Sequence, residues 1–118
     1  MTLDDVFVSR DQARRIFDAL QAAIGTLADV ESRVTKSQIA FRRRRAFAWA
    51  WVPDRYLHGQ HAPLVLSVSF RTRSTSPRWK EIVEPAPGRF MHHLELWSAW
   101  EIDDEVRGWL QQAWEAAG

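Results

Sequence analysis

The sequence predicts an α+β domain: an N-terminal helix, an antiparallel meander sheet of four to five strands, and a C-terminal helix. Apolar residues recur at three- and four-residue spacing near both ends of the chain and alternate with a period of two between them. The 118 residues, 46% of them hydrophobic, suffice for one core. We therefore expect a single domain over residues 1–118, with both helices on one sheet face and the other face open.

Each helix is predicted from a start signal followed by an apolar stripe. Ser9 and Gln12 have the spacing of a capping box, and the stripe behind them predicts a first helix over residues 10–28. Asp103, Asp104 and Glu105 precede the second stripe, and acidic residues suit a helix N-terminus because its unpaired amides attract negative charge. A second helix therefore closes the chain.

The strands are predicted from alternation. In residues 45–52 the large side chains Phe47, Trp49 and Trp51 alternate with alanines, so we expect the aromatic rings under the helices and Ala46, Ala48 and Ala50 on the open face. Residues 64–70 and 90–97 alternate in the same way. Residues 34–41 predict a further strand that pairs with residues 45–52 through a turn, and residues 73–88 predict a loop with a short strand or helical turn near residues 79–83.

Charge is sorted along the chain. Residues 33–89 contain twelve basic and three acidic residues, a net charge of +9, whereas residues 1–32 sum to −3 and residues 90–118 to −5. Fourteen of the sixteen basic residues are arginines, whose planar guanidinium groups suit phosphate and carboxylate ligands. This pattern predicts an anionic partner: a nucleic acid, a phosphorylated ligand or an acidic protein surface.

The candidate anion-binding residues centre on the run of four arginines in the predicted turn. They are Lys36, Arg42, Arg43, Arg44, Arg45, Arg71, Arg73 and Arg78, reinforced by Arg55 and Arg89. Aromatic residues lie between them in the sequence, and Phe41, Phe47, Trp49 and Trp79 would stack on bases. The alternative is a solvated turn whose charge is balanced by the acidic helix ends.

A second candidate site contains a histidine. Adjacent strand residues point to opposite faces, so His92 and His93 cannot serve one site. His93 and Glu95 share the face that we expect to be open, edged by Ser67 and Ser69, and Lys36 joins them if its strand keeps register. A neutral imidazole beside a carboxylate is able to act as a base, so these three are the catalytic candidates. The alternative is that His92 is a core residue and His93 a surface partner of Glu95.

Other classes of site have weak support. His58 and His61 are spaced for a transition metal in the loop over residues 53–62, but no third ligand accompanies them, and we expect no metal and no cofactor. The chain has no cysteine, no apolar run long enough to span a membrane and no basic-then-apolar leader, so we expect a cytoplasmic protein. Trp79 and Trp100 lack a periodic reason for burial and are candidates for exposed recognition or for a homodimer contact.

Three segments together resemble a known family. The strand Arg33-Val34-Thr35-Lys36-Ser37-Gln38-Ile39-Ala40-Phe41, the strand Arg89-Phe90-Met91-His92-His93-Leu94-Glu95-Leu96 and the closing Ile102-Asp103-Asp104-Glu105-Val106 segment resemble the bacterial family of domain of unknown function 5655. The resemblance covers nearly the whole chain and implies a compact α+β domain without an assigned activity. More distantly, the helix, sheet, helix order is similar to that of frataxin-like iron-handling proteins. The acidic ridge of those proteins is missing here, since the first helix mixes Arg14 and Arg15 with its acidic residues.

The sequence is therefore compatible with three classes of function. The favoured one is a binding module for an anionic partner. The alternatives are a small enzyme that uses His93, Glu95 and Lys36, and a frataxin-like metal-binding protein.

Overall fold

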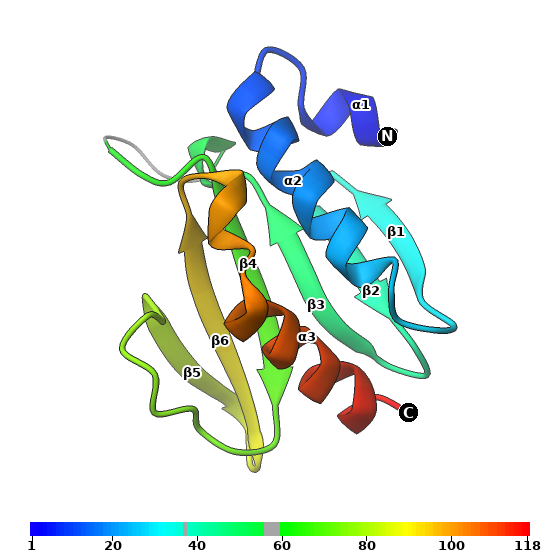
Figure 1. Ribbon diagram of the computed structural model, residues 1–118, viewed down its shortest axis with the longest axis vertical. Helices are drawn as coiled ribbons and strands as arrows, with labels where there is room; N and C mark the ends of the chain where they lie inside the picture. Colours follow the sequence, from blue (N-terminus) through cyan, green and yellow to red (C-terminus); the bar gives the residue numbers. More distant parts are fainter. Residues whose placement is uncertain (37, 56–59) are drawn as a thin grey trace.

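The computed structural model confirms the α+β class and shows two layers, a six-stranded antiparallel sheet and two main helices on one of its faces (Figure 1). It describes residues 1–36, 38–55 and 60–118, and for Arg55 it describes the backbone alone. The strand order is β1-β2-β3-β4-β6-β5. Within the described residues, no helix has both the length and the apolar character that a membrane span requires.

The two main helices lie where the apolar stripes predict them, with different starts. The first, α2 (Asp11–Ile24), begins after Arg10 as N-cap, whereas Ser9 has a φ of 58° and makes no capping box. A preceding short helix, α1 (Leu3–Val6), has the capping box instead, at Thr2. The last helix, α3 (Asp104–Ala116), has Asp103 as N-cap, and the Asp103 side chain accepts a hydrogen bond from the Val106 amide.

The sheet has more strands than the four or five expected. Residues 34–41 do not form one strand, because a turn at Lys36, whose φ is 48°, separates β1 (Glu31–Thr35) from β2 (Gln38–Arg42). The segment expected to be a loop with a short strand or helical turn near residues 79–83 contains a strand, β5 (Glu81–Ala86), which pairs with β6 (Arg89–Leu96) at the sheet edge. Since β6 lies between β4 (Leu64–Phe70) and β5, the last part of the sheet departs from a simple meander.

A β-bulge reverses the expected phase of β3 (Ala46–Trp51). Phe41 pairs with Ala48 and Arg42 with Ala46, so Phe47 is an extra residue without a partner on β2. Phe47 and Ala48 are both buried under the helices, and Ala50 is buried with them. Trp49 and Trp51 therefore lie on the open face, opposite to the prediction.

The core fills the space between the sheet and the two helices. One cluster contains the apolar residues of α2, α3 and the helix-facing side of β2, β3, β4 and β6. Trp79 belongs to it and is only 8% exposed, which corrects its expected exposure, because its ring packs on Phe70, His92 and Trp109. Trp100 is 80% exposed, as the sequence predicted.

Among the residues that the structure describes, two short 3-10 helices connect these elements. One is η1 (Pro53–Arg55), between β3 and β4, and the other is η2 (Ala99–Glu101), before α3.

Candidate functional site: an arginine hollow at one end of the sheet

Most arginines of the central segment gather at one end of the sheet. The turn between β2 and β3, the end of β4 and the start of β6 all lie there, beside the C-terminal turn of α3 (Figure 1). The arginines in these segments are Arg42, Arg43, Arg44, Arg45, Arg71, Arg73 and Arg89. Seven of the twelve basic residues of the central segment thus lie in segments at this end of the sheet.

Some of these arginines have structural partners. The Arg43 guanidinium lies 3.8 Å from the centre of the Trp114 ring and donates a hydrogen bond to the Trp114 carbonyl. The backbone amides of Arg44 and Arg45 both donate to the carbonyl of Ala117. The last carbonyl groups of an α-helix have no hydrogen-bond partner within the helix. The turn over residues 42–45, here called the arginine turn, supplies donors to these carbonyl groups of α3.

Two of the predicted anion-binding residues do not contribute a free charge at this end of the sheet. Arg78 forms ion pairs with Asp103 and Glu105, so its charge is matched by the acidic start of α3, as the alternative interpretation of the sequence expected. Lys36 lies in the turn between β1 and β2, at the opposite end of the sheet from Arg42. The side chain of Arg55 lies outside the described residues.

A hollow of about 640 Å³ lies where β3 and β4 separate. Their pairing stops at Ala48 and Val68, although β3 begins at Ala46 and β4 continues to Phe70, and the bulge at Phe47 occupies this position. Small side chains of α3 leave room on one wall, and the β5–β6 turn forms another. Ala113, Ala116 and Ala117 of α3 and its C-cap line the first wall, and Ala86, Pro87 and Gly88 line the second.

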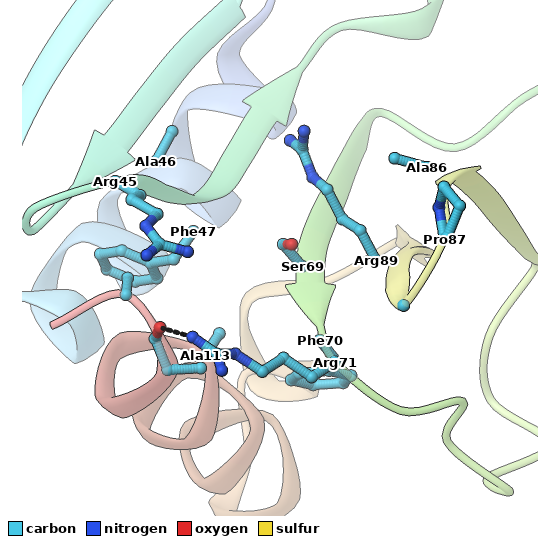
Figure 2. A pocket seen from close by; sticks show the side chains of 13 residues that line it. Arg45, Ala46, Phe47, Ser69, Phe70, Arg71, Ala86, Pro87, Arg89 and Ala113 are labelled. Atoms are coloured by element: carbon cyan, nitrogen blue, oxygen red, sulfur yellow. Dashed lines mark hydrogen bonds between the residues drawn. The ribbon is translucent and has the colours of Figure 1, made fainter.

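Three guanidinium groups border this hollow. Arg45 from the β2–β3 turn, Arg71 from the end of β4 and Arg89 from the start of β6 all line it, together with Ser69. Figure 2 shows the guanidinium groups of Arg45 and Arg71 on the side of α3, whereas the Arg89 side chain extends toward β3. Arg71 donates to the Ala116 carbonyl at 3.4 Å. The side chains of Arg45 and Arg89 have no hydrogen-bond or ion-pair partner among the described residues, and the lining contains no acidic residue.

The chemistry of such a hollow follows from its donors. A guanidinium group donates in a planar fork, accepts nothing and stays charged at any physiological pH. Three of them around one space, with a serine hydroxyl and no carboxylate, attract a ligand rich in acceptor oxygens. Arg45 and Arg71 were candidates from the sequence. Arg89 belonged only to the wider basic group, because nothing in the sequence placed it beside the arginine turn.

The open face carries the histidine candidate. Trp51 Nε1 donates to Ser67 Oγ at 2.9 Å, and Ser67 Oγ lies 2.6 Å from His93 Nδ1. Burial lowers the pKa of His93, and the nearby Glu81 offsets this only in part, so the ring is neutral at pH 7. The contact with Ser67 occupies Nδ1, and which of the two groups donates depends on the tautomer of the ring.

The expected catalytic constellation is not assembled in full. His93 and Glu95 share the open face with Ser67, as predicted, but Lys36 does not join them, because two strands, β3 and β4, separate its hairpin from β6. Lys80 takes this place, with Nζ 3.8 Å from Glu95 Oε1. The floor consists of Trp49 and Trp51 rather than alanines. Sequence alternation could have found these tryptophans only if it had detected the bulge.

The remaining histidines have other roles or lie outside the description. His92 is fully buried, as expected of a core histidine. Its Nε2 accepts a hydrogen bond from the Ser74 amide, and its Nδ1 lies 3.1 Å from the Phe90 carbonyl oxygen. His58 lies outside the described residues, and His61 lies beside the Ala62 carbonyl. Within the described part of the chain, no group of three His, Cys, Asp or Glu side chains is arranged to hold a metal ion.

Comparisons with known proteins give one result. The family model described as "Domain of unknown function (DUF5655)" matches residues 3–117. No curated protein and no solved structure matches the chain.

Proposed function

The chain belongs to the DUF5655 family, whose description assigns no activity, and we propose that it is a binding domain for a small anionic ligand held in the arginine hollow. One observation carries the proposal: Arg45, Arg71 and Arg89, from three separate segments, border one space that no acidic side chain lines. Like charges held together are unfavourable without a counter-charge, so a ligand that supplies the negative charge would stabilise this arrangement.

The free donors support the same conclusion. Guanidinium groups that serve the fold have visible partners here, such as Arg78 with its two carboxylates and Arg43 with the Trp114 ring. The side chains of Arg45 and Arg89 lack such partners among the described residues and leave their forks available. Phosphate is the anion that best matches them, because its several oxygens accept from more than one fork and from the Ser69 hydroxyl.

The shape favours a small ligand over an extended polyanion. A volume of about 640 Å³ falls within the range of small-molecule sites, and walls from α3 and the β5–β6 turn enclose the space on two sides. A flat surface for duplex nucleic acid would instead spread its cations along one exposed face. We therefore favour a phosphorylated small molecule over the other anionic partners that the sequence allows.

Calorimetric titration with inorganic phosphate and glycerol 3-phosphate tests the proposal. We expect binding that weakens as salt rises, and a weakening of about tenfold or more when Arg45→Gln and Arg89→Gln are combined, because two charged hydrogen-bond donors are lost. Arg15→Gln is the matched control, since it removes an exposed arginine of α2 far along the chain from the hollow.

Two results would overturn the proposal. One is the absence of measurable binding of either phosphate compound at low salt. The other is an equal effect of Arg15→Gln and the double variant, which would assign the binding to net charge rather than to the hollow.

A further inference from the structure

The arginine hollow opens onto the uncovered face of the sheet. Among its lining residues, Ala46, Ser69 and Arg89 have the strand parity of that face, whereas Phe47 and Phe70 belong to the core beneath the helices. The hollow therefore passes through the gap between β3 and β4, and a ligand seated in it reaches the open face without displacing any helix.

A tryptophan lies next to this opening. Trp49 is the first open-facing residue of β3 after Ala46, because the bulge shifts the alternation by one position. Its direct neighbours across the sheet are Ala40 on β2 and Ser67 on β4, and both side chains are small. Trp49 is partly exposed, with no hydrogen-bond or ring partner among the described residues.

A histidine ring lies on the far side of Ser67. His93 is the direct cross-strand partner of Ser67, and its Nδ1 is occupied by the Ser67 hydroxyl. Nε2 is therefore the nitrogen left for a ligand, as donor or acceptor according to the tautomer of the ring. Cations in the hollow, an indole beside its opening and an imidazole with a free Nε2 thus lie in sequence along one face.

We propose that the ligand is a nucleoside phosphate, with its phosphate in the arginine hollow and its base stacked on Trp49. This inference rests on the proposed function, because the hollow must hold the phosphate. Tryptophan binds flat rings through its face, and every nucleobase presents such a face, whereas an aliphatic phosphate would leave the indole unused. A free mononucleotide and the 5′-terminal nucleotide of a single strand share this chemistry.

The test compares phosphates that differ in the ring and in the length of the chain. We titrate the protein with glycerol 3-phosphate, adenosine 5′-monophosphate, adenosine, and a short single-stranded oligonucleotide with and without a 5′-phosphate. We expect the mononucleotide to bind about tenfold or more tightly than glycerol 3-phosphate, because stacking of one base on an aromatic side chain has about this effect. A mononucleotide that matches the phosphorylated oligonucleotide identifies the free nucleotide as ligand, and a tighter oligonucleotide identifies the strand end.

Substitutions assign the gain to Trp49. Trp49→Leu should abolish the advantage of the mononucleotide and leave the affinity for glycerol 3-phosphate unchanged, whereas Trp49→Phe keeps a ring and should retain part of it. Trp100→Leu is the matched control, since Trp100 is the most exposed indole. Circular dichroism of each variant shows whether it is folded, and the comparison among ligands on the native protein does not depend on any variant.

The outcomes separate this inference from the proposed function. If glycerol 3-phosphate binds through Arg45 and Arg89 as tightly as the mononucleotide does, the nucleotide inference is wrong and the anion site stands. If no phosphate compound binds, both fall. If the mononucleotide binds tightly but Trp49→Leu retains its full advantage, the base is not on this tryptophan and the inference is wrong.

Discussion

Replacing Phe47 and Trp49 separately by alanine tests the bulge on which the hollow and the position of Trp49 both depend. The two residues are two positions apart in one strand and would share a face in a regular strand. In the structure Phe47 is 1% exposed within the core, whereas Trp49 lies on the face that no helix covers. The two substitutions should therefore differ strongly in their cost.

The sizes follow from burial. Loss of a fully buried phenylalanine lowers the free energy of unfolding by about 3–5 kcal/mol, because the cavity adds to the lost transfer energy. Loss of Trp49 should cost about 1 kcal/mol, since this residue is only partly buried and lies outside the core cluster. In a domain of this size about 4 °C of Tm corresponds to 1 kcal/mol, so Phe47→Ala should lower the Tm by roughly 12–20 °C.

Guanidinium chloride unfolding, followed by far-ultraviolet circular dichroism, measures both values on one scale. Circular dichroism avoids the loss of a fluorescent tryptophan in one variant. Equal losses, or a larger loss for Trp49→Ala, would show that the aromatic residues of β3 share one face and would refute the bulge.

Two further predictions concern groups near the candidate site. Burial lowers the pKa of His92 below its usual value of about 6.5, so below that pH the unfolded chain binds a proton that the native chain does not. The free energy of unfolding should therefore fall as pH drops from 7 to 5, and His92→Gln should flatten this fall. Urea titrations at several pH values measure how the free energy of unfolding depends on pH. If it falls as steeply in the His92→Gln variant as in the native protein, His92 is not the cause of the fall. Arg43→Ala should lower stability by about 1–2 kcal/mol, because it removes the contact with the Trp114 ring and a donor to the end of α3. Calorimetry should show phosphate affinity unchanged within about twofold, since the Arg43 fork is already occupied, and a tenfold loss of affinity would place Arg43 in the ligand site.

Periodicity in the sequence predicts the fold class because each long element has an unbroken pattern. The strand over residues 64–70 has the predicted bounds, and the acidic group at Asp103 marks the start of the last helix. Two strands depended on tertiary pairing instead. β1 is mostly exposed and so lacks an apolar pattern, and β5 contains Pro85 and exposed residues that only an edge strand tolerates.

The candidate site was predictable in composition but not in position. The arginine run indicated a basic region, yet the grouping of Arg45, Arg71 and Arg89 requires the β6 start to lie beside the β4 end. The phase of β3 was wrong because a bulge inserts one residue without a clear mark in an alternating run such as residues 46–51. Lys80 replaced Lys36 near Glu95 because residues 73–80 carry the chain back to the edge of β6.

The gathering of arginines at one end of the sheet also affects how the molecule meets a partner. Acidic residues mark the starts of α2 and α3, and the arginine turn adjoins the end of α3, so the separated charges make the protein an electric dipole. In the field of an anion this dipole experiences a torque that rotates the hollow toward the ligand during diffusion. Productive encounters should therefore be more frequent at low ionic strength than the small net charge of +1 suggests.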